Sequence, residues 1–184
     1  MRKIIVREMI SVDGFFAGAK GEINWHKVDV EFNQDSLEFL ENVDTLIFGR
    51  VTYDLMASYW PTSDALEDDP IIAHKMNSLQ KIIFSKTTDK VIWNNSTTIS
   101  EINAAEIQKM KQGLGKDIAI FGSGMIVSAL TELGLIDEYR FIVNPVILGK
   151  GKSLFTNSKK MPNLKLLETY EFKSGNVLLS YKPM

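Results

Sequence analysis

Short hydrophobic runs along the chain alternate with segments whose hydrophobic positions recur every three or four residues. A short apolar run predicts a buried strand, and the three-to-four spacing predicts a helix with one buried face. Strands are predicted at residues 3–10, 45–48, 81–85, 117–121 and 139–148, with 91–93 as a further candidate. Helices are predicted at residues 33–43, 72–79, 103–112 and 125–133, and after Thr52, the expected cap of a helix that ends at Pro61.

The C-terminal part has a different pattern. Two strand-like runs, 164–172 and 177–181, are separated by a turn around Gly175 and predict an antiparallel hairpin. Residues 12–21 are expected to form a loop, and residues 150–152 a basic turn. The alternation of strands and helices predicts an α/β fold with a mostly parallel central sheet, helices on both faces and the hairpin at one edge. Without an internal repeat or linker, residues 1–184 are expected to form a single domain.

Composition excludes several function classes. The formal net charge of −2 shows no basic excess for nucleic acid or an acidic membrane surface. No apolar stretch approaches 18 residues and the N-terminus has no signal-peptide core, so a cytoplasmic protein is expected. Because the chain has no cysteine and only His26 and His74 as imidazoles, disulfides, thiolate zinc sites and three-histidine metal sites are excluded, and no metal site is expected.

Candidate binding residues follow three predicted strands at 49–52, 85–87 and 122–124. In open α/β sheets, ligands bind outside the carboxyl ends of strands, and helix N-termini there attract anions. Arg50 adds a forked cation that suits phosphate, and Lys86 adds a second cation. A glycine after a strand is more often only a turn, but three such sites in one chain favour a polyanionic ligand. A dinucleotide with an extra phosphate fits this pattern.

The glycines do not form a standard nucleotide-binding motif. A Rossmann fingerprint that began with Gly122 and Gly124 would need glycine or alanine at position 127, where this chain has Val127. No Walker A sequence occurs either, which argues against an NTPase.

Four motifs resemble those of a known family. Residues 11–17 match a Ser-x-Asp-Gly segment after the first strand, residues 48–53 a Gly-Arg-x-Thr helix start, and residues 118–124 a strand followed by two glycines. Residues 129–151 carry Ala-Leu, then Gly-Leu-Ile-Asp-Glu, then Pro-Val-Ile-Leu-Gly-x-Gly. In these motifs the sequence resembles the dihydrofolate reductase-like superfamily. Within it, the chain is similar to the reductase domain of the bacterial riboflavin-biosynthesis deaminase-reductase, here as a stand-alone relative.

The resemblance implies a three-layer fold, NADPH as the cofactor, and hydride transfer from the nicotinamide to a C=N or C=O carbon. The substrate would be a small pyrimidine-like or pterin-like heterocycle such as 5-amino-6-(5-phosphoribosylamino)uracil, and the protein a homodimer. By match to the family, the cofactor-binding residues would be Ala17, Gly18, Gly49, Arg50, Thr52, Ser85, Lys86, Gly122, Ser123, Gly124, Met125 and Ile126. Non-catalytic binding or sensing of NADPH is the alternative function, and a flavin-binding protein is a third.

The same resemblance suggests residues for the substrate and for catalysis. Substrate-binding candidates are Asp13, Gly14, Trp25 and Tyr53, and catalytic carboxylate candidates are Asp13, Asp29 and Glu31. Each has a plainer alternative: Asp13 suits a turn before Gly14, Trp25 a buried loop aromatic, and Asp29 and Glu31 a solvated charged stretch. His26 is expected to be an exposed histidine without a catalytic role.

Overall fold

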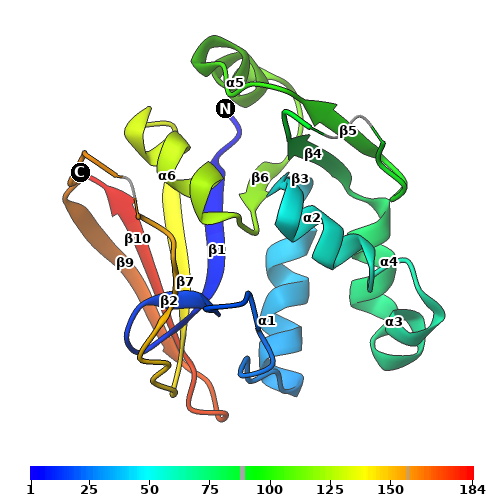
Figure 1. Ribbon diagram of the computed structural model, residues 1–184, viewed down its shortest axis with the longest axis vertical. Helices are drawn as coiled ribbons and strands as arrows, with labels where there is room; N and C mark the ends of the chain where they lie inside the picture. The colour runs from blue at the N-terminus through cyan, green and yellow to red at the C-terminus, as the bar shows by residue number, and fades with distance from the viewer. Residues whose placement is uncertain (88–89, 157) are drawn as a thin grey trace.

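The computed structural model describes residues 1–87, 90–156 and 158–184. Its main feature is an eight-stranded sheet with the strand order β5-β4-β3-β6-β1-β7-β10-β9 (Figure 1). The strands from β5 to β7 are parallel, and β10 and β9 continue the sheet antiparallel at one edge. This confirms the predicted mostly parallel sheet with a C-terminal hairpin. The strands are β1 (Ile4–Ser11), β3 (Val43–Gly49), β4 (Gln80–Phe84), β5 (Ser96–Ile99), β6 (Asp117–Ile120), β7 (Glu138–Asn144), β9 (Leu164–Glu171) and β10 (Val177–Pro183).

Helices cover both faces of this sheet because its central strands are apolar on both sides. Along β1, Ile4 and Val6 pack in one hydrophobic cluster with helices α5 and α6, while Ile5 packs in the other with α1, α2 and α4. This arrangement confirms the predicted layers. The helices are α1 (Val30–Glu41), α2 (Arg50–Ala57), α3 (Ser63–Asp68), α4 (Pro70–Ser78), α5 (Ala104–Gln112) and α6 (Gly124–Glu132). In the described part of the chain, no helix has the length and apolar character needed to cross a bilayer.

A second, two-stranded sheet lies beside the main one and corrects two sequence predictions. It consists of β2 (Phe15–Gly18) and β8 (Gly151–Ser153), which pair antiparallel although the sequence predicted a loop and a basic turn there. Neither strand has a distinctive sequence pattern because each is only three or four residues long and the two lie far apart in the chain. Gly151 permits the pairing, since a Cβ at this position would lie 2.4 Å from the carbonyl oxygen of Ala17.

Several predicted boundaries differ from the structure. The strand candidate at 91–93 is wrong: Trp93 is a buried core residue, and the edge strand is the more polar β5. Thr52 does not cap the helix after β3, because the N-cap is Gly49 and the helix begins at Arg50. The short helix α3 was missed, and α1 begins earlier than predicted because Asp29 caps it.

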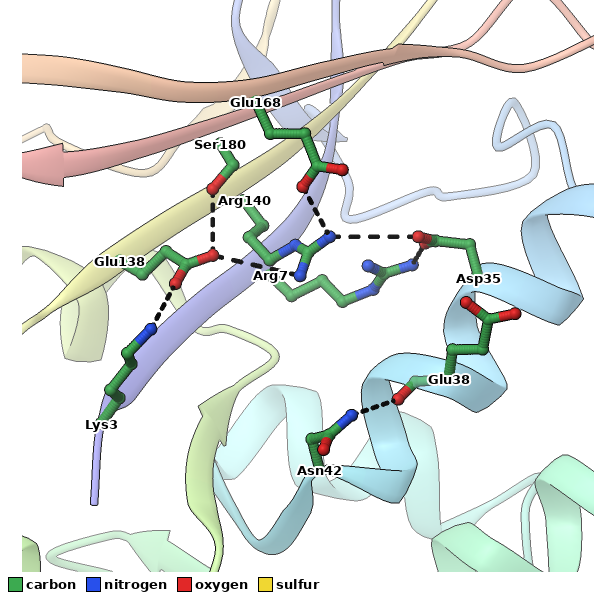
Figure 2. Close-up of polar contacts among 9 residues, drawn as sticks. All are labelled: Lys3, Arg7, Asp35, Glu38, Asn42, Glu138, Arg140, Glu168 and Ser180. Atoms are coloured by element: carbon green, nitrogen blue, oxygen red, sulfur yellow. Dashed lines mark hydrogen bonds and ion pairs between the residues drawn. The ribbon is translucent and has the colours of Figure 1, made fainter. Parts of the chain in front are cut away.

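A network of ion pairs fastens α1 to the sheet (Figure 2). Arg7, Arg140, Ser180 and Glu168 occupy paired positions on β1, β7, β10 and β9, so they form one row across the strands. The buried Arg7 forms an ion pair with Asp35 of α1, and Arg140 lies 3.6 Å from Glu168. The Arg7 guanidinium also stacks 4.9 Å from the ring centroid of Phe39 on the same helix. The position of α1 is therefore set by charge as well as by apolar packing.

Candidate active site

A cavity of about 840 Å³ lies at the carboxyl ends of β1, β3 and β6, among the starts of α2 and α6 and the small β2–β8 sheet. This volume is within the range of small-molecule and cofactor sites. Hydrophobic side chains that are exposed to solvent gather around it: Val51 and Leu55 from α2, and Met125 from α6. An exposed apolar rim of this kind suits a ligand that covers it.

The two helices that begin at the cavity share an unusual feature. Among the described helices, α1, α3, α4 and α5 each begin with a side chain that accepts a hydrogen bond from the first turn. The N-caps of α2 and α6, Gly49 and Ser123, make no such bond. The first N–H groups of both helices are therefore left without a side-chain acceptor, and the helix dipole adds partial positive charge there. Together the two helix starts suit an anionic ligand.

Glycines allow the ends of the neighbouring strands β3 and β6 to approach closely beneath the cavity. The Gly49 N–H donates to the carbonyl oxygen of Gly122 at 3.2 Å, and a Cβ on Gly49 would lie 2.3 Å from Oγ of Ser123. Gly122 has a φ of +81°, and the Gly122–Ser123 peptide bond is cis. A Cβ on Gly124 would lie 2.9 Å from the carbonyl oxygen of Ser153 on β8. The glycines are thus required by packing within the protein, whether or not a ligand contacts them.

The structure brings half of the predicted cofactor-binding residues to the cavity. Those that line it are Ala17, Thr52, Gly122, Ser123, Gly124 and Met125. Of the others, Gly49 lies beneath the cavity against Ser123, Ile126 is buried in the core, and Gly18 lies at the end of β2 beside Ala17. Arg50 follows β3 and forms an ion pair with Asp54 at 2.7 Å, whereas Ser85 and Lys86 follow the neighbouring strand β4. These three residues lie at the same edge of the sheet as the cavity but do not line it.

The three predicted catalytic carboxylates lie outside the cavity lining. Asp13 accepts hydrogen bonds from the backbone N–H groups of Leu148 and Gly149, at 3.1 and 2.7 Å. Asp29 is the N-cap of α1, and Glu31 accepts from the Tyr170 hydroxyl at 2.7 Å. The pKa of Asp13 is lowered mainly by a hydrogen bond with Ser11 and further by these two amides. The pKa of Glu31 is lowered mainly by a hydrogen bond from the Lys173 amide. Each carboxylate therefore has a structural role that accounts for its charge.

The remaining predicted substrate-binding residues are also placed elsewhere. Gly14 lies in the turn after β1 with a φ of +83°. Tyr53 is buried, and its hydroxyl accepts from the N–H groups of Ile92 and Trp93 at 3.1 and 3.0 Å. The indole N–H of Trp25 donates to the carbonyl oxygen of Glu22 at 3.0 Å. None of the three lines the cavity, although the Trp25 ring packs edge-on against His26, which does.

Glu8 of β1 is a carboxylic acid that lines the cavity and was not among the residues predicted from the sequence. Its Oε1 atom is buried and has no hydrogen-bond partner among the described residues. A Cβ on Gly122 would lie 3.1 Å from Oε1 of Glu8 and 3.0 Å from Oγ1 of Thr52, which places these groups together on the cavity wall. Burial raises the pKa of Glu8 to about 8. Its position in the strand was a signal in the sequence. Glu8 lies on the same face of β1 as the buried residues Ile4 and Val6, where an apolar residue is expected.

His26 was expected to be exposed, but it is half-buried and lines the same cavity. Burial lowers its pKa to about 4, against a smaller opposing effect of a hydrogen bond with the Phe16 backbone. Its Nε2 atom is buried and has no partner among the described residues. At neutral pH the cavity thus holds a neutral imidazole and a largely protonated carboxyl group.

Comparison with known proteins identifies the family. The family model of the RibD C-terminal domain matches residues 2–178. The chain belongs to this family. The RibD C-terminal domain described here is also similar to uncharacterized protein YyaP of Bacillus subtilis (strain 168), with 33% identity over 180 residues that cover 98% of this chain and 94% of the relative. The family match confirms the resemblance stated from the sequence motifs.

Solved structures share the fold of this RibD C-terminal domain. A putative riboflavin biosynthesis protein from Shewanella sp. PV-4 superposes with a TM-score of 0.75 at 21% identity, over 99% of both chains. Dihydrofolate reductase from Enterococcus faecalis, complexed with NADP(H) and RAB-propyl, superposes with a TM-score of 0.67 at 13% identity, over 98% of this chain and 96% of that one. At these identities the likeness establishes the dihydrofolate reductase-like fold alone.

Proposed function

We propose that this chain is an NADPH-dependent reductase that transfers hydride to a small heterocyclic substrate of the pyrimidine or pterin kind. The observation that carries the proposal is the cavity of about 840 Å³ flanked by two helix starts without side-chain caps. Membership of the RibD C-terminal domain family supports it, as does the shared fold with a dihydrofolate reductase that binds NADP(H).

The cavity residues fit such a coenzyme in charge and in shape. The uncapped N–H groups at the starts of α2 and α6 suit its phosphates. The exposed side chains of Val51, Leu55 and Met125 offer apolar surface to its sugars and rings. Arg50 and Lys86, which follow neighbouring strands, are the cations proposed for the 2′-phosphate.

A bound nicotinamide coenzyme would supply the hydride donor. The protein has to hold the substrate, limit the access of water and manage one proton. Asp13, Asp29 and Glu31 are engaged in hydrogen bonds elsewhere. Two carboxyl groups line the cavity, and since Glu132 accepts hydrogen bonds from Ser158, Lys159 and Lys160, Glu8 is the one available to a substrate. The same proposal includes a homodimer, which the family resemblance implies, and a location in the cytoplasm, which is expected from the sequence.

Titration of the purified protein with NADPH and with NADH tests this function. We expect NADPH to raise the melting temperature and to bind more tightly than NADH, and we expect oxidation of NADPH in a screen of pyrimidine and pterin substrates. The absence of any thermal shift with either nucleotide would overturn the proposal. Tight binding of NADPH without turnover across the screen would favour the non-catalytic binding module instead.

A further inference from the structure

Among the described residues, Glu8 is the cavity-lining acid that has a buried carboxyl oxygen, Oε1, without a hydrogen-bond partner. The other titratable side chains of the lining are His26, Lys152 on β8 and Glu132 on α6. Glu132 is engaged, because it accepts from the Ser158 hydroxyl and from the backbone N–H groups of Lys159 and Lys160. Lys152 is exposed, and its Nζ is directed toward Gly21. The lining side chains of α2 carry no charge.

The next residue along β1 does not neutralise Glu8. Successive side chains of a strand leave opposite faces of the sheet, and Arg7 forms its ion pair with Asp35 of α1 on the far side. The carboxyl group is therefore buried without an ion-pair partner, and this loss of solvation favours its protonated form. A protonated carboxyl group is both a hydrogen-bond donor and a source of a proton.

His26 offers the complementary group. A neutral imidazole that donates through one nitrogen accepts through the other, and its hydrogen bond with the Phe16 backbone leaves Nε2 as the acceptor. The cavity then contains one buried donor and one buried acceptor without protein partners. Unsatisfied buried polar groups are costly, so a ligand that satisfies both is bound with discrimination against one that does not.

Resting on the proposed reductase function, we infer that Glu8 is the catalytic acid of this site and that His26 accepts a hydrogen bond from the same substrate. The substrate class is an uncharged nitrogen heterocycle that presents a C=N nitrogen to Glu8 and an N–H group to His26. A substrate whose ring carries a charge would meet no opposite charge at either group.

The proton and electrons balance in one step. The carbon of the C=N bond accepts the hydride with its electron pair from the reduced nicotinamide coenzyme of the proposed function. The C=N π bond breaks, the O–H bond of Glu8 breaks, and an N–H bond forms on the substrate. Glu8 is left as a carboxylate and regains its proton from solvent after the product leaves.

The first experiment reads Glu8 without coenzyme or turnover. Protein labelled with carbon-13 at the glutamate side-chain carboxyl is titrated by NMR, and the Glu8 signal is assigned as the one that is missing from Glu8→Gln. We expect its midpoint near pH 8. A midpoint near 4.5, the ordinary value for glutamate, would overturn the assignment.

The second experiment measures turnover of NADPH with a heterocycle found in the substrate screen, as a function of pH. For the wild type, kcat should fall as pH rises above about 8, because only protonated Glu8 donates. Glu8→Gln keeps the shape but has no proton to give, so kcat should fall roughly 100-fold or more and lose this pH dependence. Glu8→Asp should recover part of the rate. Glu171→Gln, on the exposed edge strand β9, is the matched control and should equal the wild type.

His26 is tested by the split between KM and kcat. His26→Phe removes the acceptor and should raise KM roughly tenfold, and His26→Gln, whose amide oxygen can accept, should recover part of it. If the wild type turns over and Glu8→Gln has the same kcat, the catalytic assignment of Glu8 is overturned, although the reductase function stands. Absence of wild-type turnover across the screen would instead reject the reductase function.

Discussion

Arg7 and Glu8 are consecutive residues of β1 whose side chains leave opposite faces of the sheet. Arg7 meets Asp35 of α1 in an ion pair, while Glu8 enters the cavity, where its Oε1 atom has no partner among the described residues. On one face of β1 the protein neutralises the charge of Arg7, and on the other it leaves the carboxyl group of Glu8 available to a ligand. The two residues have different consequences for stability and for binding.

The stability of the protein should depend on pH through Glu8. Its pKa in the folded state is about 8, above the 4.5 of an ordinary glutamate, so the unfolded state ionises first. The stability associated with protonated Glu8 is fully present below pH 4.5 and is lost as pH rises toward 8. Urea unfolding measures the free energy of unfolding at pH 5 and at pH 8. Between these values the wild type should lose on the order of 3 kcal/mol more of this free energy than Glu8→Gln. Equal pH dependence of the two proteins would show that Glu8 is not buried in this way.

Loss of Asp35 should destabilise the fold without affecting the cavity. Asp35→Asn leaves the buried guanidinium of Arg7 without its anionic partner, at a cost of about 3 kcal/mol in the free energy of unfolding. Glu38→Gln, on the same helix with an exposed side chain, is the control and should cost much less. Affinity for NADPH, measured below the melting temperature, should stay within about twofold of the wild type, because Asp35 does not line the cavity and pairs with Arg7, whose side chain leaves β1 on the face opposite Glu8. A large loss of NADPH affinity in Asp35→Asn would contradict this separation.

Arg50 and Lys86, the two cations proposed for the 2′-phosphate, should select between the coenzymes. Arg50→Ala and Lys86→Ala should each weaken NADPH by about 1.5–3 kcal/mol and NADH much less, because only NADPH carries the 2′-phosphate. Asp54→Ala releases Arg50 from its ion pair and should leave NADPH binding unchanged or tighter. Calorimetric titration of each variant with both coenzymes measures the difference. If the two coenzymes weaken equally, the cations do not lie at the 2′-phosphate.

The close approach of Gly49 and Ser123 predicts a coupled pair of substitutions. Gly49→Ala places a Cβ 2.3 Å from Oγ of Ser123 and should destabilise the protein by about 1–3 kcal/mol. Because the φ of Gly49 is −81°, backbone strain does not contribute. Removal of the hydroxyl in Gly49→Ala/Ser123→Ala should restore part of the loss, which a double-mutant cycle from chemical denaturation would measure. Additive effects would indicate that the two strand ends lie farther apart.

Local sequence patterns predicted much of the fold. The apolar runs of β1, β3, β4 and β6 and the spaced apolar positions of α5 and α6 are signals that neighbouring residues create by themselves. The glycines and cations after the strands also indicated the edge of the sheet at which the cavity lies, since carboxyl ends of parallel strands meet there. The two short strands β2 and β8 could not be predicted, because their pairing depends on residues more than a hundred positions apart.

The amino-acid sequence by itself determined the layers of this protein, its family and the end of the sheet where the cavity lies, because periodicity and motifs are local properties. Which acid enters the cavity was decided only by the tertiary structure. The sequence pointed to Asp13, Asp29 and Glu31 and gave no reason to choose Glu8, but the first three are held by backbone or hydroxyl donors. Glu8 and His26 differ because distant elements of the fold place both on the same cavity and bury them, and burial shifts the pKa of each.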